Sequence, residues 1–293
     1  LENARVELFY AQFAKKQNLP AGRGKTVEWR KWNTFAKATK LLEGVIPTGQ
    51  KFGMSSKTGT IDQFGTYAAI TDVLEMRAYD DIILGATEEM GASAAETQET
   101  LIRDGLLVNT NVLYCDNITL ADGSVAGTPT TPAQMEASAT VMSVLTPDMV
   151  SKAVTKMKKD RVPTINGKYY AVIHPSVAHD LRQSEEWIEA HKYAAPEQLF
   201  NGEIGELHGC RFIENAFAPV LGDSYKNKAG TATYASYMFG KDGFGIIDPE
   251  GGALEMIVKD KSQIGGPLNQ FSTIGYKFET NGATILYPER MLR

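Results

Sequence analysis

Two stretches decide the fold: Thr26-Val-Glu-Trp-Arg-Lys-Trp-Asn33 and Lys57-Thr-Gly-Thr-Ile-Asp-Gln-Phe64. Their alternation of apolar and polar residues is typical of β-strands. The chain between them is punctuated by Gly and Pro, as in Gly44-Val-Ile-Pro-Thr-Gly49, and this predicts the tip of a long hairpin. At roughly 3.3 Å per residue, an excursion of about 15 to 20 residues each way would reach roughly 50 Å from its base.

Two of the three tryptophans, Trp29 and Trp32, lie on this hairpin. A two-stranded ribbon has little core of its own and is marginally stable alone in water. Large aromatic rings on it therefore need a second surface. We take another subunit as the hypothesis to test. The alternative is that both rings cover the body of their own chain.

The residues before the hairpin predict a short amphipathic arm. Val6, Phe9, Tyr10 and Phe13 share one stripe at helical spacing within residues 1–18. The segment Pro20-Ala-Gly-Arg-Gly24 that follows is typical of a flexible hinge.

After the hairpin, the residues 84–108 predict the longest helix, which would span roughly 37 Å at 1.5 Å per residue. Small residues dominate its first half, so we expect neighbouring backbone to approach closely there. Residues 115–138 are rich in Gly, Thr, Ala and Pro and indicate an irregular insertion. Thr146, Pro147 and Asp148 then form the N-cap, first-position and acidic first-turn pattern of a second helix.

The remaining elements alternate irregularly. We expect a buried strand at Tyr169–Ile173 and a helix beginning near Pro175. Further strands are predicted at 211–214, 234–239, 245–248, 254–258, 271–278 and 283–287. No regular βαβ alternation emerges, so the pattern favours the α+β class.

Composition excludes several classes of protein. The chain has 293 residues, of which 43% are hydrophobic and 22% are charged, so it is an ordinary globular sequence. Its 30 basic and 35 acidic residues give a net charge of −5, whereas proteins that neutralise phosphates carry a basic excess. Two cysteines, Cys115 and Cys210, predict a reducing compartment. We expect no membrane partner, because no apolar run approaches the roughly 20 residues of a bilayer span.

No catalytic or metal-binding constellation emerges, so we expect no enzyme, no cofactor and no metal. Gly24-Lys25-Thr26 lacks the earlier glycine and the following helix of a phosphate-binding loop. Gly240-Lys-Asp-Gly-Phe-Gly245 opens no helix and predicts a hairpin turn. His179-Asp180 with Ser184 contains the residue types of a catalytic triad, but a triad is defined by geometry.

An acidic cluster and the remaining histidines are the other candidates for chemistry. Acid–base work or a hard cation would suit carboxylates at this spacing, and a solvated face or an intersubunit ion pair is the favoured interpretation. The acidic residues are Asp72, Glu75, Asp80 and Asp81, near Arg77. The histidines His174, His191 and His208 are expected to pack or to form surface hydrogen bonds.

Seven segments taken in order resemble the major capsid proteins of tailed bacteriophages, most closely the family typified by coliphage N-four. They are Glu43-Gly-Val-Ile-Pro-Thr-Gly49, Tyr169-Tyr-Ala-Val-Ile-His-Pro175, Trp187-Ile-Glu-Ala-His-Lys-Tyr193, Phe200-Asn-Gly-Glu-Ile-Gly205, Gly209-Cys-Arg-Phe-Ile-Glu214, Pro267-Leu-Asn-Gln270 and Gly275-Tyr-Lys277.

The resemblance implies the Hong Kong 97-like capsid fold. Its parts would be an N-terminal arm (1–25), an extended loop (26–66), a peripheral domain (67–165) with spine helix 84–108, an axial domain (166–245) and returning peripheral strands (246–293). The extended loop would lie over a neighbouring subunit. Combining it with the aromatic and acidic patterns gives these candidate intersubunit contacts: Phe9, Phe13, Trp29, Trp32, Val45, Ile46, Asp80 and Asp81.

The implied function is a shell of pentamers and hexamers that encloses double-stranded DNA without sequence specificity. The protein would belong to the virion and assemble in the cytoplasm of the bacterial host, with portal, scaffold and decoration proteins as further partners. One alternative is the shell protein of a cellular nanocompartment (encapsulin-like) with the same fold. A second, from another class, is a cytosolic hydrolase that uses His179 and Asp180.

Overall fold

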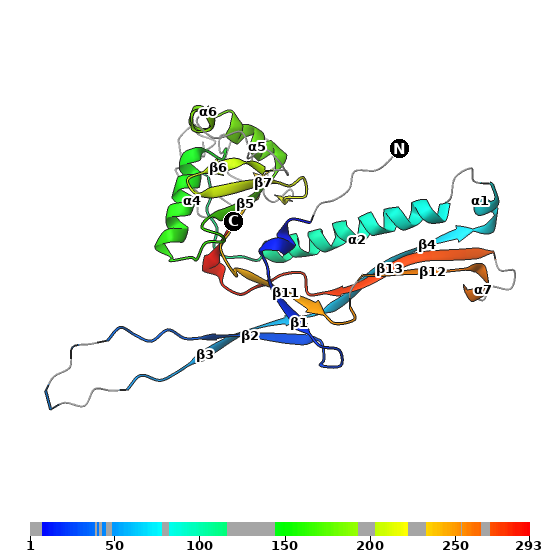
Figure 1. The fold of residues 1–293 in the computed structure, drawn as a ribbon, viewed down its shortest axis with the longest axis horizontal. Helices are drawn as coiled ribbons and strands as arrows, with labels where there is room; N and C mark the ends of the chain where they lie inside the picture. The colour runs from blue at the N-terminus through cyan, green and yellow to red at the C-terminus, as the bar shows by residue number, and fades with distance from the viewer. Residues whose placement is uncertain are drawn as a thin grey trace, which may run out of the picture.

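The computed structural model describes residues 8–38, 40, 43–44, 49–77, 82–115, 144–192, 203–221, 233–252, 254–264 and 270–293. Figure 1 shows a two-stranded ribbon that projects from a body of two parts. One part is a long helix that lies along a narrow sheet, and the other is a five-stranded sheet with shorter helices. Helices and strands follow no repeating βαβ order, so the predicted α+β class is confirmed.

The ribbon consists of β2 (Thr26–Trp32) and β3 (Met54–Thr60), which pair antiparallel. After β3 the chain passes through Ile61 into β4 (Asp62–Thr71), which belongs to a different sheet. The single strand predicted over 57–64 is therefore wrong. Ile61 is buried and its backbone N–H donates to the Lys25 carbonyl, so this residue marks where the ribbon joins the body.

A long helix and a three-stranded antiparallel sheet form the part that lies beyond the ribbon. They are α2 (Ile82–Leu106) and the strands β12 (Glu255–Lys259), β13 (Phe271–Thr280) and β4. Helix α2 runs along one face of the sheet, where Ala94 packs against Tyr276 and Phe278 (Figure 1). The predicted strut over 84–108 is confirmed with a shift of two residues. Two short helices, α1 (Asp72–Arg77) and α7 (Lys261–Ile264), lie at the end of this part that is farthest from the ribbon (Figure 1).

The second part is built on a five-stranded mixed sheet. Its strands are, in spatial order, β15 (Met291–Leu292), β10 (Tyr237–Phe239), β5 (Tyr169–Ile173), β7 (Cys210–Glu214) and β6 (Glu203–Leu207). Its helices are α4 (Pro147–Lys159), α5 (Pro175–Arg182) and α6 (Glu185–Lys192). Met157, Trp187 and Phe212 are among the residues of its apolar core. A short ladder of β8 (Val220–Leu221) and β9 (Thr233–Tyr234) lies outside this sheet.

Local sequence signals explain where two of these helices begin. The Thr146 hydroxyl accepts a hydrogen bond from the Met149 backbone N–H at 3.4 Å, so the predicted N-cap of α4 is confirmed. His174 caps α5, where its Nδ1 accepts from the Ser176 backbone N–H at 3.1 Å. Helix α4 and strand β15 pack with this sheet, whereas the family resemblance groups their residues with the peripheral ranges 67–165 and 246–293.

Residues 9–19 differ from the predicted arm, because they pack into the body of their own chain. Only one turn of 3₁₀ helix forms, η1 (Tyr10–Phe13), and it is followed by β1 (Lys15–Leu19). Strand β1 pairs in parallel with β11 (Phe244–Pro249), whose other neighbour is β14 (Thr284–Ile285). The physical reason is aromatic packing: Tyr10 is fully buried, and the Phe13 ring stacks on Phe239 with centroids 5.2 Å apart.

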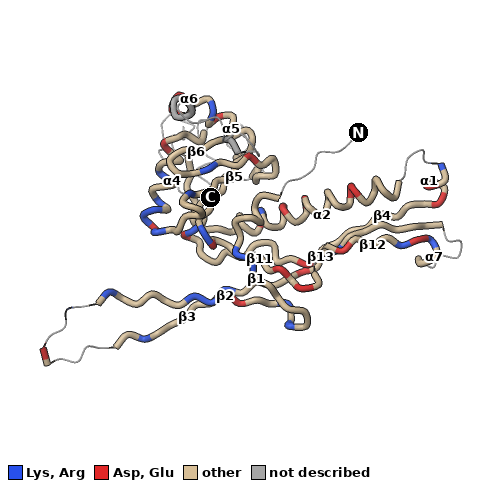
Figure 2. The backbone as a smooth tube through the Cα atoms, viewed as in Figure 1, with Lys and Arg blue, Asp and Glu red and all other residues tan. Residues whose placement is uncertain are grey.

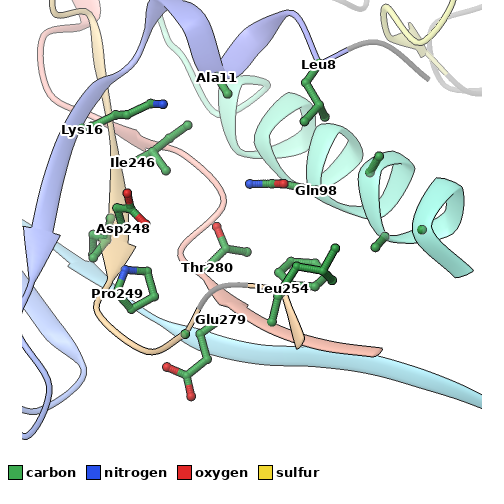
Figure 3. Close-up of a pocket in the computed structure, with 16 residues that line it drawn as sticks. Leu8, Ala11, Lys16, Gln98, Ile246, Asp248, Pro249, Leu254, Glu279 and Thr280 are labelled. Atoms are coloured by element: carbon green, nitrogen blue, oxygen red, sulfur yellow. The ribbon is translucent and has the colours of Figure 1, made fainter. Parts of the chain in front are cut away.

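The small residues of α2 border a cavity, which corrects the expected close approach of neighbouring backbone. The cavity measures about 260 Å³ and lies between α2, β1, β11 and β13 (Figure 3). An added Cβ on Gly91 would meet no atom within 4 Å. Backbone approaches the helix closely near its end, where a Cβ on Gly105 would lie 2.9 Å from the Ala283 carbonyl oxygen.

Candidate assembly surfaces

Trp29 fastens the base of the ribbon to the body. Its side chain packs in a cluster with Ile61, Ile247 and Leu286 and is 8% exposed. The indole ring fits against two glycines, because a Cβ on either Gly59 or Gly245 would lie 2.8 Å from the ring. Trp29 is therefore a contact within the chain, and its assignment as an intersubunit contact is corrected.

The indole of Trp29 also carries an unsatisfied polar atom. Its Nε1 is buried and has no hydrogen-bond partner. Leaving a buried donor unpaired costs about 1–3 kcal/mol. The ring therefore stabilises this position through its shape and apolar area and not through a hydrogen bond of its N–H.

A second set of contacts fastens the ribbon to the C-terminal segment. The Lys31 ammonium lies 4.6 Å from the centroid of the Tyr287 ring and 3.5 Å from a Glu289 carboxylate oxygen. The Arg290 guanidinium packs on the same ring at 4.0 Å, within the short helix η4 (Pro288–Arg290). These exposed contacts contribute little each to stability, and they join the ribbon to the C-terminal segment.

The outer part of the ribbon presents uncovered aromatic surface. The Trp32 side chain is 60% exposed and stacks on Phe52 with centroids 4.4 Å apart. Phe52 also stacks with Phe35, and the centroids of these two rings lie 5.6 Å apart. The Gln50 side-chain amide bonds to the backbone N–H and carbonyl of Ala36, so the two chain segments stay paired beyond the strands. We call Trp32, Phe35 and Phe52 the aromatic stack.

Sequence reasoning found only one member of this stack. Phe35 and Phe52 lie outside the predicted strands, and a signal for them was available: isolated aromatic residues in a segment otherwise rich in Gly, Thr and Lys. Large apolar side chains are also exposed at the opposite end of the molecule, on α1, α7 and the adjoining strand ends. They are Val73, Leu74, Met76, Ile264 and Phe271.

Charge is divided between the ribbon and the strut. Residues 23–60 contain eight Lys or Arg and two acidic residues, whereas residues 62–107 contain ten acidic residues and two Arg. Figure 2 shows the blue positions along β2 and β3 and the red positions along α2. On α2, the exposed residues include Glu88 and Glu96. Residues 23–60 are therefore predominantly basic and residues 62–107 predominantly acidic, which suits contact between copies.

The other predicted contacts have varied positions. Phe13 is buried beside Tyr170 and Phe239, so its assignment as an intersubunit contact is wrong, and Phe9 is half-buried against the same cluster. Val45, Ile46, Asp80 and Asp81 lie outside the described residues.

The candidate hydrolytic residues do not form a triad. His179 and Asp180 are exposed neighbours whose side chains lie 3.7 Å apart, and the Ser184 hydroxyl donates to the Leu181 carbonyl at 2.7 Å. Burial lowers the pKa of His174, partly offset by Glu214, and its ring stacks on Tyr234. Cys210 is fully buried, and burial raises the pKa of its thiol well above its usual range, which favours the neutral thiol.

Two further predictions concern metals and membranes. Across the described residues, no three His, Cys, Asp or Glu side chains are grouped as a metal ion would require. None of the helices in the described part of the chain combines the length and apolar character needed to span a bilayer.

The fold, with its ribbon projecting from a two-part α+β body, is similar to those of solved phage capsid structures. The head protein of Helicobacter pylori bacteriophage KHP40 is similar with a TM-score of 0.70 at 12% identity, over 100% of this chain and 93% of that one. The capsid structure of cyanophage P-SCSP1u is similar with a TM-score of 0.67 at 15% identity, over 100% of this chain and 89% of that one. A structure from Mycobacterium phage Che8 is similar with a TM-score of 0.66 at 14% identity, over 100% of this chain and 92% of that one. These likenesses confirm the Hong Kong 97-like fold.

The phage capsid protein family model matches residues 55–282, and the chain belongs to that family. It is a major capsid protein, a structural component of the virion. Among curated proteins, no sequence gives a significant match. The more particular resemblance to the coliphage N-four family stays a prediction.

Proposed function

We propose that this chain builds the icosahedral head of a tailed double-stranded-DNA phage by joining copies of itself into pentamers and hexamers. It acts as a structural subunit without catalysis. The observation that carries the proposal is the exposed aromatic stack on a basic ribbon, in a chain that belongs to the phage capsid family. An uncovered aromatic surface of this kind is typical of a surface that becomes buried on association.

The geometry favours a head-to-tail contact in which the ribbon of one copy lies on a neighbour. Such heterologous contacts close into rings, as a pentamer or hexamer requires. Each contact need be only of ordinary size, roughly 1,600 Å², because every subunit makes several at once. The opposite charges of residues 23–60 and 62–107 would orient the approaching copies.

The net negative charge of the chain supports weak binding between the shell and the packaged DNA. A net charge of −5 gives the shell no basic excess with which to hold DNA through counterion release, so packaged DNA would be contained without tight binding. Portal, scaffold and decoration proteins are further proposed partners, and the cytoplasm of the bacterial host is the proposed place of assembly.

Electron microscopy of the purified full-length chain tests the proposal, with sedimentation to quantify particles. We expect closed shells or the rings from which shells form, and a chain that stays monomeric at all protein concentrations would overturn the proposal. The contents of native particles separate the two shell functions. A large head filled with double-stranded DNA supports the phage role, and a small shell loaded with an enzyme would establish the nanocompartment instead.

Trp32→Ala tests the ribbon itself. We expect normal folding and fewer particles, because the ring is 60% exposed and stacks on Phe52, which is itself exposed. Val108→Ala is the matched control, since it also removes an exposed apolar side chain, two residues after α2 and away from the ribbon. Equal particle yields for both variants would contradict a role of the aromatic stack in assembly.

A further inference from the structure

Glu99, in the second half of α2, joins three parts of the molecule through one oxygen atom. Its side chain is fully buried, and Oε1 accepts hydrogen bonds from the backbone N–H groups of Phe9 at 3.0 Å and Tyr10 at 3.3 Å. The same oxygen accepts from Asn215 Nδ2 at 3.1 Å. The Asn215 backbone N–H donates to the Ile173 carbonyl at 2.9 Å, which links this point to β5.

The second carboxyl oxygen has no such support. Oε2 of Glu99 is buried without a hydrogen-bond partner, and so is the hydroxyl of Tyr10. Tyr10 itself belongs to an apolar cluster that includes Ile102 and Phe239. An ionised carboxylate shares its negative charge between both oxygens. Burying that charge on an oxygen that receives no hydrogen bond costs far more free energy than burying a neutral carboxyl. The neutral form of Glu99 therefore fits the site better than the ionised form.

The surrounding charged groups do not reverse this preference. Burial raises the pKa of Glu99 above its ordinary value, and the three donors and Arg103 oppose that rise. The Arg103 guanidinium is engaged by Asp104 at 2.8 Å and by the Phe217 carbonyl at 3.3 Å. Tyr10 from η1 and Tyr237 from β10 are the other titratable groups here, and burial raises the pKa of both phenols, so both stay neutral.

We propose that Glu99 is a proton-dependent latch for residues 9–19, whose neutral carboxyl holds this segment on the body and whose ionisation loosens it. The sign follows from linkage. Because the folded chain raises the pKa of Glu99, its stabilising contribution is complete below the pKa of the unfolded chain and is lost as the pH rises through the folded pKa. The latch would make the attachment of the N-terminal segment to the body depend on pH.

Hydrogen–deuterium exchange of the full-length chain at a series of pH values tests the latch directly. Peptides that contain Phe9 and Tyr10 report the two amides that bond to Glu99. After correction for the intrinsic exchange rate, we expect their protection to fall by up to about tenfold per pH unit between the unfolded and folded pKa values of Glu99. In Glu99→Gln, which cannot ionise, protection should be flat over the same range.

Glu96→Gln is the matched control, because Glu96 lies on the same helix and is exposed. It should keep the wild-type slope. A wild-type profile without a slope, or an equal slope in Glu99→Gln, would overturn the latch. Should Glu99→Gln not fold, Asn215→Ala retains the carboxyl and removes one donor from Oε1. The fall in protection should then extend to higher pH, and an unmoved profile would also count against the proposal.

The latch is independent of the proposed function. It is measured on an unassembled chain, so a failed latch leaves the shell role intact, and a chain without shells could still show the latch.

Discussion

The two tryptophans of the ribbon make opposite predictions when each is replaced by alanine. Trp29 is 8% exposed and fitted between two glycines, whereas Trp32 is 60% exposed. Removing a buried Trp side chain costs about 3–5 kcal/mol, because apolar burial is lost and a cavity remains. Trp32→Ala should cost about 1 kcal/mol or less, since it removes only a stacking contact between exposed rings.

Thermal unfolding of unassembled protein measures the first effect. At about 2–4 °C per kcal/mol for a chain of this size class, Trp29→Ala should lower the Tm by about 10 °C, and Trp32→Ala by no more than about 4 °C. Particle yield, read by sedimentation and electron microscopy, measures the second effect, and it should fall in Trp32→Ala. Equal Tm values for the two variants would refute the reasoning that Trp29 belongs to the core of its own chain.

Other substitutions test separate features. Gly245→Ala should destabilise the chain by about 1–3 kcal/mol, because its Cβ would lie 2.8 Å from the Trp29 ring. Gly91→Ala should stabilise the chain by up to about 1 kcal/mol, because alanine is the better helix former and its Cβ meets no atom within 4 Å. Urea unfolding measures both changes. Thr146→Ala should cost about 1 kcal/mol through the lost N-cap of α4, and an unchanged urea midpoint would contradict this role. The double variant Lys37→Glu, Lys51→Glu should reduce particle yield relative to the matched Lys→Arg pair, most strongly at low salt.

Elements with local signals were predicted well from the sequence. The strut helix, the capped start of α4, and the strand at Tyr169–Ile173 all depend on residues close together in the chain. Periodicity and capping report such local preferences directly. The family resemblance added the architecture, which no local pattern contains.

The different roles of Trp29 and Trp32 could have been separated by strand geometry. Residues three apart on a strand point to opposite faces, so the two rings could not share one surface. The burial pattern of β2 agrees, since Val27 and Trp29 are buried on one face. What the sequence could not provide was the identity of the covering residues, Ile247 and Leu286, which lie far along the chain.

The N-terminal segment was mispredicted for a related reason. Phe9, Tyr10 and Phe13 fit a helical stripe, and only long-range packing against Phe239 reveals that one turn forms before a strand begins. Glu99 was missed as well, because a single acidic residue in a helix carries no sign that it will be buried. Its partners Phe9 and Asn215 are distant in sequence.

The pairing of β1 with β11 has a consequence for synthesis on the ribosome. Lys15–Leu19 can complete its sheet only after residues 244–249 have been translated, and Met238 and Phe239 wait still longer for Leu292 and Met291. A nascent chain thus holds its N-terminal strand without a partner through most of translation. Closure of the body is deferred until nearly all of these residues have emerged, so a half-made subunit cannot enter a growing particle in its final shape.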